Sequence, residues 1–238
     1  MRRRFFIGHF SGQTASVEGE TAHHLGHVLR AKPGQLYELS DGAKVWLARI
    51  DRVARDRVEF SLLEEVPAYQ PVIDVTLLLA IVKFDAFEWA IEKATELGVS
   101  TIVPLAAARS ERALLSAAAK RKERWTKMLV EASQQSRRLR VPALRPLLRS
   151  EQAFQAEQSK LRIMLSEQAD APPLRQALAG ESPSTVALAI GPEGGWTDIE
   201  LNAAKSAGFR HTSLGPLILR TETAVVAALA SINYAFAE

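Results

Sequence analysis

Apolar segments of two kinds alternate along the last two thirds of the chain. The runs at 75–82 (VTLLLAIV) and 185–190 (TVALAI) are apolar apart from one threonine each, which is typical of parallel strands buried on both faces. Five segments have the composition of strands: 75–82, 101–103 (ending at Pro104), 162–165, 185–190 and 211–214. Four segments have the spacing or caps of helices: 87–97, 111–138, 197–207 and 222–236. The segment 111–138 is long and basic and could be interrupted. The alternation predicts an α/β fold with a parallel sheet.

The first 66 residues have a different pattern. Short segments predict strands at 5–7, 45–50 and 58–62, with turn signals at Gly34 and at Asp41-Gly42 and one helical piece at 22–29. A small β-rich barrel or sheet is therefore expected before a linker bounded by two prolines. We predict two domains, 1–68 and 72–238.

Composition excludes several classes of protein. The chain has 238 residues, of which 47% are hydrophobic and 24% charged, and none is cysteine. Disulfides, thiolate metal sites and cysteine-dependent methylation of pyrimidine carbon 5 are thereby excluded. The histidines, such as the pair His23-His24, lack a metal-ligand spacing, so no metal is expected. No apolar stretch predicts a membrane span or a signal peptide, and we expect a cytoplasmic protein.

Positive charge is concentrated in one part of the chain. Residues 109–149 contain twelve basic and three acidic residues, whereas the whole chain has a net charge of only +3. A localised basic surface is the electrostatic signature of a polyanionic partner. The alternative is an ordinary solvated helix surface.

Three loops follow predicted strands at the end where ligands bind in parallel sheets. They are 165–167 (LSE), 191–195 (GPEGG) and 215–224 (GPLILRTETA). GPEGG has neither the lysine nor the spacing of a phosphate loop, and Glu193 at its centre would repel phosphate. Its glycines still allow close backbone approach to a compact ligand. S-adenosylmethionine, which carries no phosphate, fits; the alternative is a tight turn before a capped helix.

Charged residues in the third loop suggest chemistry. Thr221 or Thr223 can cap the final helix, but capping does not explain Arg220 between apolar segments. A buried ion pair between Arg220 and Glu222 is the structural alternative.

Together, these motifs resemble the RsmE family of ribosomal RNA methyltransferases in the SPOUT superfamily. The matching segments are IGPEGG at 190–195, LGPLILRTETA at 214–224, KATELGV at 93–99, the HL..VLR..G pattern at 24–34, and Arg138 with Val141-Pro142. The sequence departs from the family at Gln134-Gln135, where Glu-Gln is common, and at Ala86 and Phe87, where basic residues are common.

The resemblance implies a PUA-like N-terminal β-barrel followed by a SPOUT domain with a C-terminal trefoil knot, which binds S-adenosylmethionine and pairs as a homodimer. It implies methylation of N3 of one uridine in 16S ribosomal RNA of the small subunit. The cofactor residues it implies are Leu165, Ser166, Glu167, Ile190, Gly191, Pro192, Glu193, Gly194, Gly195, Leu214, Gly215, Leu217, Leu219, Thr221, Thr223 and Ala224.

In the expected reaction, Arg220 stabilises the negative charge that develops on the uracil oxygens, and Glu222 orients Arg220 or takes the proton. The expected RNA contacts are Arg3, Arg4, Arg30, Lys83, Lys93, Arg109 and Arg138. Two other functions stay open. One is SPOUT methylation of transfer RNA or 23S ribosomal RNA, at a base or a ribose; the other is a non-catalytic RNA-binding assembly factor.

Overall fold

The computed structural model describes residues 3–168 and 170–236, which divide into two compact units. The first unit contains the chain up to Gln70 together with Ser133–Val141. The second contains Pro71–Ala132 and the chain from Pro142 onward. The change of unit at Gln70 lies between the two prolines of the expected linker, at Pro67 and Pro71. The return of residues 133–141 to the first unit was not predicted, because that segment continues a basic helix without a break in its sequence pattern.

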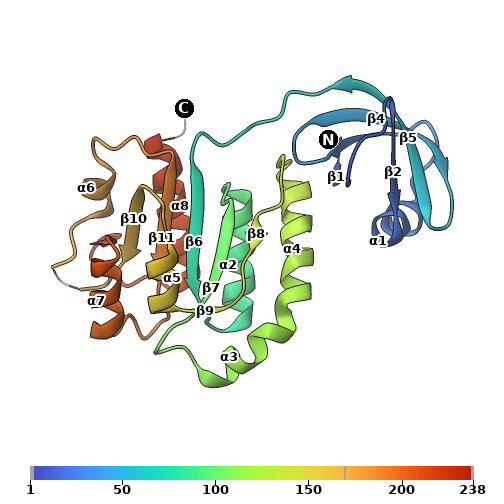
Figure 1. The fold of residues 1–238 in the computed structure, drawn as a ribbon. Helices are drawn as coiled ribbons and strands as arrows, with labels where there is room; N and C mark the ends of the chain where they lie inside the picture. Colours follow the sequence, from blue (N-terminus) through green and yellow to red (C-terminus); the bar gives the residue numbers. More distant parts are fainter. Residues whose placement is uncertain (1–2, 169, 237–238) are drawn as a thin grey trace. The chain divides into compact units, whose positions relative to one another are not determined.

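The first unit is built on a curled sheet (Figure 1). Its strands run in the order β1-β3-β4-β5-β2. Their bounds are β1 Arg4–Phe6, β2 Thr14–Glu18, β3 Leu36–Ser40, β4 Val45–Val53 and β5 Arg57–Glu65. Helix α1 (Gly19–His23) continues into a π-helical turn (His24–Val28), where 22–29 was expected to be helical. The core includes Phe5, Leu39 and Phe60, each at most 2% exposed.

Residues 133–141 join this sheet through side chains near its end. Arg4, on β1, is 3% exposed and pairs with Glu38 of β3, with Nη2 2.8 Å from Oε2. Arg137 pairs with the other oxygen of the Glu38 carboxylate. Arg4 also donates a hydrogen bond to the backbone carbonyl of Arg137. The hydroxyl of Ser40 donates to the carbonyl of Leu139 at 2.8 Å. The unit therefore needs this later segment to complete its polar core.

The second unit is an entirely parallel sheet, in the order β12-β10-β11-β6-β7-β8, with β9 also paired to β7. The strands are β6 Asp74–Ala80, β7 Thr101–Ala106, β8 Ala143–Leu144, β9 Leu148–Arg149, β10 Leu161–Leu165, β11 Thr185–Ile190 and β12 Arg210–Thr212. The helices are α2 Phe84–Glu96, α3 Arg112–Ala118, α4 Lys122–Gln135, α5 Ser150–Ala156, α6 Leu174–Leu178, α7 Asp198–Ser206 and α8 Thr221–Phe236. A 3-10 turn at Ala119–Arg121 separates α3 from α4, so the predicted basic helix is indeed broken.

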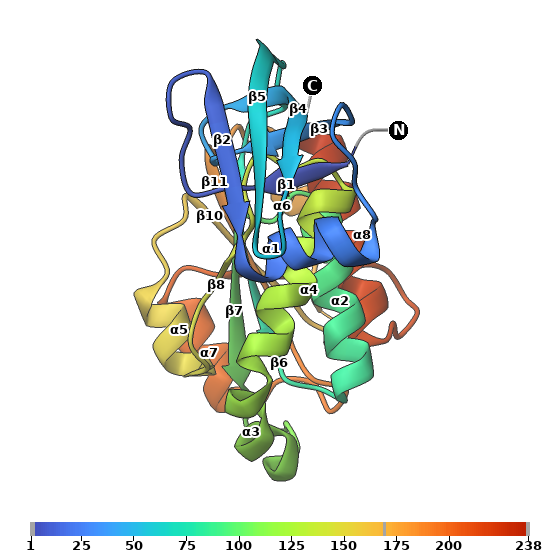
Figure 2. The same ribbon diagram turned by 90° about the vertical axis from the view of Figure 1, so that its right-hand side faces the viewer.

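Helices cover both faces of this sheet. Figure 2 shows α5 and α7 on one face and α2 and α8 on the other. Phe154 of α5 and Phe209, which precedes β12, pack on the first face with ring centroids 5.1 Å apart. Phe87 of α2 and Ile232 of α8 are fully buried. Burial on both faces explains why 75–82 and 185–190 are apolar at every position except Thr76 and Thr185.

One strand end differs from the prediction. Strand β7 does not end at Pro104 but continues through it to Ala106. Strand β8 pairs with 101–102 and β9 with 105–106, so no neighbour on that side needs an amide hydrogen from Pro104. The gap between two short strands therefore accommodates the proline inside the sheet.

Candidate functional site

The three predicted loops meet at one cleft of about 580 Å³ in the second unit. They follow β10, β11 and β12, which are neighbours in the sheet and point the same way. Their carboxyl ends therefore lie at one edge, as expected for a parallel sheet. Nearly all of the expected cofactor residues line this cleft: Leu165, Ser166, Glu167, Ile190, Gly191, Pro192, Glu193, Gly194, Gly195, Leu214, Gly215, Leu217, Leu219, Thr221 and Ala224. Thr223 does not line it and is exposed.

The GPEGG loop is a tight turn fixed by two side chains from outside it. The amide of Gly195 donates to the carbonyl of Pro192 at 2.8 Å, and Gly195 has a φ of +71°, a conformation that favours glycine. The hydroxyl of Thr221 donates to the carbonyl of Gly191 at 3.2 Å. Arg109, on the loop after β7, donates to the carbonyl of Gly194 at 2.7 Å. Three different strand ends thus contribute to one loop conformation.

Trp196 joins the first loop to the second, and sequence reasoning missed it. Its indole Nε1 donates to the carbonyl of Leu165 at 2.8 Å. Its ring packs so closely on Gly191 that a Cβ at that position would lie 3.0 Å from the ring. The position of Trp196 directly after GPEGG, and its size, were the available signals. Gly191 is therefore needed for packing against the tryptophan.

A buried glutamate connects helix α7 to the loop after β7. Glu200 is 1% exposed and completes the predicted capping box with Thr197. Its Oε1 also accepts the amide of Ala108 at 3.0 Å. Burial raises the pKa of Glu200, but the hydrogen bonds from Thr197 and Ala108 outweigh it and hold the pKa below its ordinary value. The ionised carboxylate therefore ties the start of α7 to the loop that carries Arg109.

Charged side chains of both signs line the cleft. Glu167, Glu193 and Asp198 supply carboxylates, and Arg109 and Arg220 supply guanidinium groups. Arg220 is exposed. Within residues 3–168 and 170–236, no ion pair joins it to Glu222, which does not line the cleft. The structural alternative of a buried Arg220–Glu222 pair is therefore wrong.

The remaining lining residues were not among the individually expected cofactor residues. They are Gln168, Asp198, Leu201, Ser213, Pro216 and Ile218. Pro216 and Ile218 lie inside the predicted third loop, and the other four lie within a few residues of a predicted loop.

The expected RNA contacts differ in exposure and in whether their charge is already paired. Arg3, Arg30 and Lys83 are exposed. The prediction for Arg4 is wrong, because its charge is buried against Glu38. Lys93 lies between Glu92 and Glu96, with N–O distances of 2.7 and 2.8 Å, so its charge is already compensated.

Arg138 and Arg109 also differ from simple surface cations. Arg138 is half-buried and donates to the carbonyl of Arg140, and burial lowers its pKa to about 10. Arg109 lies at the cleft rather than on the basic surface. The expectation that both are ordinary phosphate contacts is not supported by their positions.

Much of the positive charge of the 109–149 segment is used internally. Glu88 of α2 is 5% exposed and pairs with Arg121 at 3.0 Å and Arg124 at 2.9 Å. Burial raises the pKa of Glu88, but its bonds to Arg124, Trp125 and Arg121 lower it overall. Arg121 also lies over the ring of Phe84, 4.3 Å from its centroid. The charge count of this segment therefore overstates its attraction for a polyanion.

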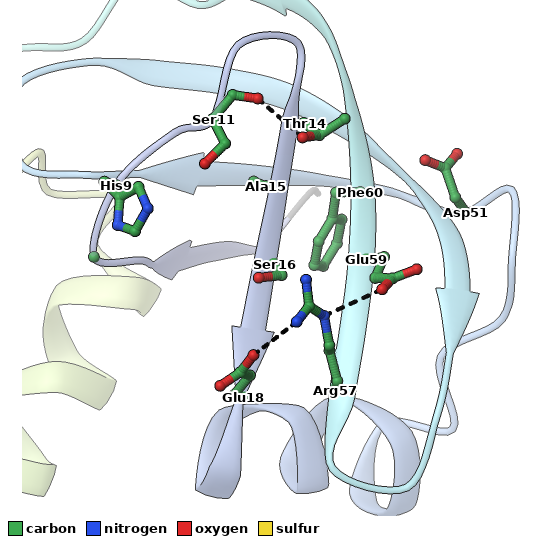
Figure 3. A pocket seen from close by; sticks show the side chains of 11 residues that line it. His9, Ser11, Thr14, Ala15, Ser16, Glu18, Asp51, Arg57, Glu59 and Phe60 are labelled. Carbon is green, nitrogen blue, oxygen red and sulfur yellow. Dashed lines mark hydrogen bonds and ion pairs between the residues drawn. The ribbon is translucent and has the colours of Figure 1, made fainter.

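A second hollow, of about 470 Å³, lies in the first unit beside β2 and β5. Figure 3 shows Arg57 between Glu18 and Glu59, and the structure places it 3.1 Å from each carboxylate. Asp51 accepts a bond from the hydroxyl of Ser61. The arginine in this hollow is neutralised and the other charged groups are acidic, so the hollow does not suit a phosphate group.

Neither a metal-binding cluster nor a membrane-spanning helix is present among the described residues. No cluster of three or more histidine, aspartate or glutamate side chains in 3–168 and 170–236 could hold a metal ion. Over the same residues, no helix has the length and apolar character needed to cross a membrane.

Comparison with known proteins gives matches along most of the chain. A family model described as an RNA methyltransferase domain matches residues 68–233, and one described as an RNA methyltransferase PUA domain matches 17–63. Ribosomal RNA small subunit methyltransferase E of Synechocystis is 35% identical, over 92% of this chain and 73% of that protein. The protein of the same name from Bacillus subtilis is 34% identical, over 93% and 90%.

Two solved structures match nearly the whole chain. The first is the ribosomal RNA small subunit methyltransferase E of Neisseria gonorrhoeae bound to S-adenosyl methionine. It superposes with a TM-score of 0.89 at 31% identity, over 99% of this chain and 98% of that one. The second is a methyltransferase from Legionella pneumophila in complex with bound SAM. It gives a TM-score of 0.90 at 30% identity, over the same shares.

Proposed function

The chain belongs to the RNA methyltransferase family of ribosomal RNA small subunit methyltransferase E, and we propose that it methylates N3 of one uridine in 16S ribosomal RNA. Its methyl donor is S-adenosylmethionine, which the Neisseria and Legionella structures contain. The observation that carries the proposal is the cleft at the ends of β10, β11 and β12, with Arg220 on its lining and unpaired among the described residues.

The cleft residues fit this donor. S-adenosylmethionine has a flat aromatic purine, ribose hydroxyls, two cationic groups, one carboxylate and no phosphate. Leu165, Ile190 and Leu219 offer apolar contact for the purine. The cleft carboxylates, which would repel a phosphate, suit hydroxyl groups and cations. When bound, the donor supplies an electrophilic methyl group on its sulfonium sulfur.

The proposed chemistry of this chain's own residues concerns charge on the target base. N3 of uridine would form the new N3–C bond as the bond between the methyl carbon and the donor sulfur breaks; that electron pair stays on sulfur, which becomes a neutral thioether, and the N3 proton passes to solvent water. Negative charge develops on the flanking uracil oxygens. Arg220 donates to one of these oxygens and stabilises the charge in the transition state. Holding the base in line with the methyl group supplies much of the remaining acceleration.

Glu222 has no part in this mechanism. It was expected to orient Arg220 or to take the N3 proton. It lies in the first turn of α8, does not line the cleft and forms no ion pair with Arg220 in the described part of the chain. The proposed catalysis therefore rests on Arg220.

The RNA contacts that we propose are fewer than the basic segment suggested. They are the exposed cations Arg3 and Arg30 in the first unit and Lys83 in the second. Contacts of this kind hold the phosphate backbone and fix the position of the RNA without reading its sequence. The target base would still have to leave its stack to reach the cleft, at a cost of a few kcal/mol.

A trefoil knot and a homodimer are also part of the proposal. Helix α8 starts after the edge strand β12, yet packs against α2, and Nδ2 of Asn233 donates to the carbonyl of Leu97 at 2.8 Å. This return from the sheet edge to its centre supports threading of the last segment. Leu217 and Ile218 are 78% and 81% exposed on the lining of the cleft, which supports burial against a second copy. Light scattering after gel filtration tests the dimer.

Methyl transfer with mass analysis of the product tests the function. Labelled S-adenosylmethionine is incubated with small ribosomal subunits that lack base methylation, with naked 16S RNA and with transfer RNA. We expect N3-methyluridine in the small subunit or its RNA. Label only in transfer RNA, or on a ribose, would contradict the proposed substrate. No label, with no binding of the donor, would favour an assembly factor.

A further inference from the structure

Arg109 is held in a fixed position at the cleft by its neighbours. The hydroxyl of Ser110 donates to the carbonyl of Ile81 at 2.7 Å and is buried. The amide of Ala108 donates to the buried carboxylate of Glu200 at 3.0 Å. Both residues flanking Arg109 are therefore anchored to other elements of the second unit. Side chains on such anchored loops lose less entropy when they bind a ligand.

The side chain of Arg109 lies along the GPEGG loop. A Cβ on Gly194 would come 3.3 Å from its Cβ and 3.4 Å from its Cδ. Its Nη1 donates to the carbonyl of Gly194 at 2.7 Å. A guanidinium group has five N–H donors, and a carbonyl bond to Nη1 leaves most of them for other partners. The residue lines the cleft and is exposed.

The charge of Arg109 has no carboxylate partner in the described part of the chain. Other cations of this unit do have partners: Arg121 and Arg124 pair with Glu88, and Lys93 pairs with Glu92. The cleft thus offers two uncompensated guanidinium groups, on Arg109 and Arg220, beside several carboxylates. Arg220 is assigned to the target base in the proposed mechanism. Arg109 remains without a ligand.

Building on the proposed function, we infer that Arg109 binds the carboxylate of the methionine part of S-adenosylmethionine. That carboxylate is the one anionic group of the donor, and the cleft carboxylates would repel it. A planar guanidinium matches a carboxylate with two parallel hydrogen bonds. The bond to Gly194 turns Arg109 toward the glycine loop, where a ligand in the cleft would lie. Arg109 therefore selects the amino-acid end of the donor while it holds the loop.

Binding of two donor analogues to matched variants tests the inference. Calorimetry compares S-adenosylmethionine with decarboxylated S-adenosylmethionine, which keeps the sulfonium and the amine but lacks the carboxylate. Arg109→Met should weaken binding of the first by roughly ten- to a hundredfold, the range of a charged hydrogen-bonded pair. It should change binding of the second by less than about threefold. Arg109→Lys keeps the positive charge but lacks the planar guanidinium. Its affinity for S-adenosylmethionine should lie between those of the unmodified protein and Arg109→Met. Arg112→Met, an exposed arginine of α3 outside the cleft, is the control.

Three other outcomes overturn the inference. Equal loss of both ligands would make Arg109 only a support for the GPEGG loop. Unchanged donor binding with weaker RNA binding would make it a phosphate contact. Failure of the unmodified protein to bind S-adenosylmethionine would overturn the proposed function together with this inference. Thermal unfolding of each variant shows whether a loss reflects misfolding.

Discussion

At the level of single residues, the cleft is organised by side chains that bind backbone carbonyls. Thr221, Trp196 and Arg109 each hold one carbonyl of a neighbouring loop. The sequence indicated the loops, because a glycine-rich segment that follows an apolar strand can be recognised from the order of residues alone. It did not indicate Trp196 or Arg109 as partners, because which carbonyl a distant side chain reaches depends on the packing of the sheet.

Replacement of Arg220 should lower turnover and spare cofactor binding. Arg220→Ala removes the group that stabilises charge on the uracil oxygen, and we expect kcat to fall by about 100- to 1000-fold. The affinity for S-adenosylmethionine should stay within about threefold, as measured by calorimetry. Full turnover of this variant would exclude Arg220 from the mechanism.

A methyl group on Gly191 should loosen the cleft. It would lie 3.0 Å from Cε2 of Trp196, so the indole, which is held by its bond to the carbonyl of Leu165, must shift to make room. Gly191→Ala should lower the free energy of unfolding by about 1–3 kcal/mol and weaken donor binding. Gly8→Ala, where a Cβ meets nothing within 4 Å, is the matched control. An unchanged free energy of unfolding and unchanged donor affinity would show that the indole of Trp196 can move away from residue 191 without destabilising the cleft.

At the level of elements, a capping box does more than start helix α7. The pattern Thr197-x-x-Glu200 predicted the helix correctly, since a capping box is a local interaction. The second bond of Glu200, to Ala108, joins residues far apart in the sequence and could not be predicted from spacing. The same holds for Pro104, which local rules place at a strand end, although strand pairing accommodates it within β7.

Loss of Glu200 should therefore affect two elements at once. Glu200→Ala leaves the amides of Thr197 and Ala108 without their acceptor. We expect the free energy of unfolding, measured with urea, to fall by about 1–3 kcal/mol. Donor affinity should fall as well, because the loop that carries Arg109 loses its anchor. Glu123→Ala, at an 85% exposed side chain, controls for the removal of a carboxylate. A loss no larger than that of Glu123→Ala would contradict this role.

At the level of the whole molecule, buried glutamates should make stability depend on acid pH. Glu38, Glu88 and Glu200 have pKa values held below their ordinary value of 4.5. For Glu38, burial raises the pKa, but hydrogen bonds from Arg137 and Arg4 outweigh it. The folded state therefore binds fewer protons than the unfolded state. Their contribution is complete above the ordinary value and is lost as pH falls through each lowered pKa.

Urea unfolding between about pH 3 and pH 7 should show this loss. The urea concentration at the midpoint of unfolding should decrease once the pH is below about 4.5. Glu200→Gln should reduce this pH dependence, because glutamine does not titrate. Unfolding is followed with separate signals for the two units, since they need not unfold together. A Glu200→Gln variant with the same acid dependence as the unmodified protein would contradict the assignment.

RNA binding should depend on a few exposed cations rather than on total charge. Arg30→Gln should reduce the slope of log affinity against log salt by about 0.7 for single-stranded RNA, the value of one phosphate contact. Lys93→Gln should leave the slope unchanged, because Lys93 already pairs with Glu92 and Glu96. Filter binding over a range of salt concentrations measures both. Equal effects of the two changes would mean that internal ion pairs do not reduce the attraction for RNA.

The return of residues 133–141 to the first unit has a consequence for synthesis on the ribosome. Glu38 receives one of its arginines, and Ser40 its acceptor, from a segment about a hundred residues later in the chain. During translation, the first unit cannot be completed until Val141 has left the exit tunnel. The elements β6, α2, β7 and α3 precede Val141 in the chain and have left the tunnel before it. The N-terminal unit is therefore first in sequence, but it cannot be finished before part of the second unit is available to fold.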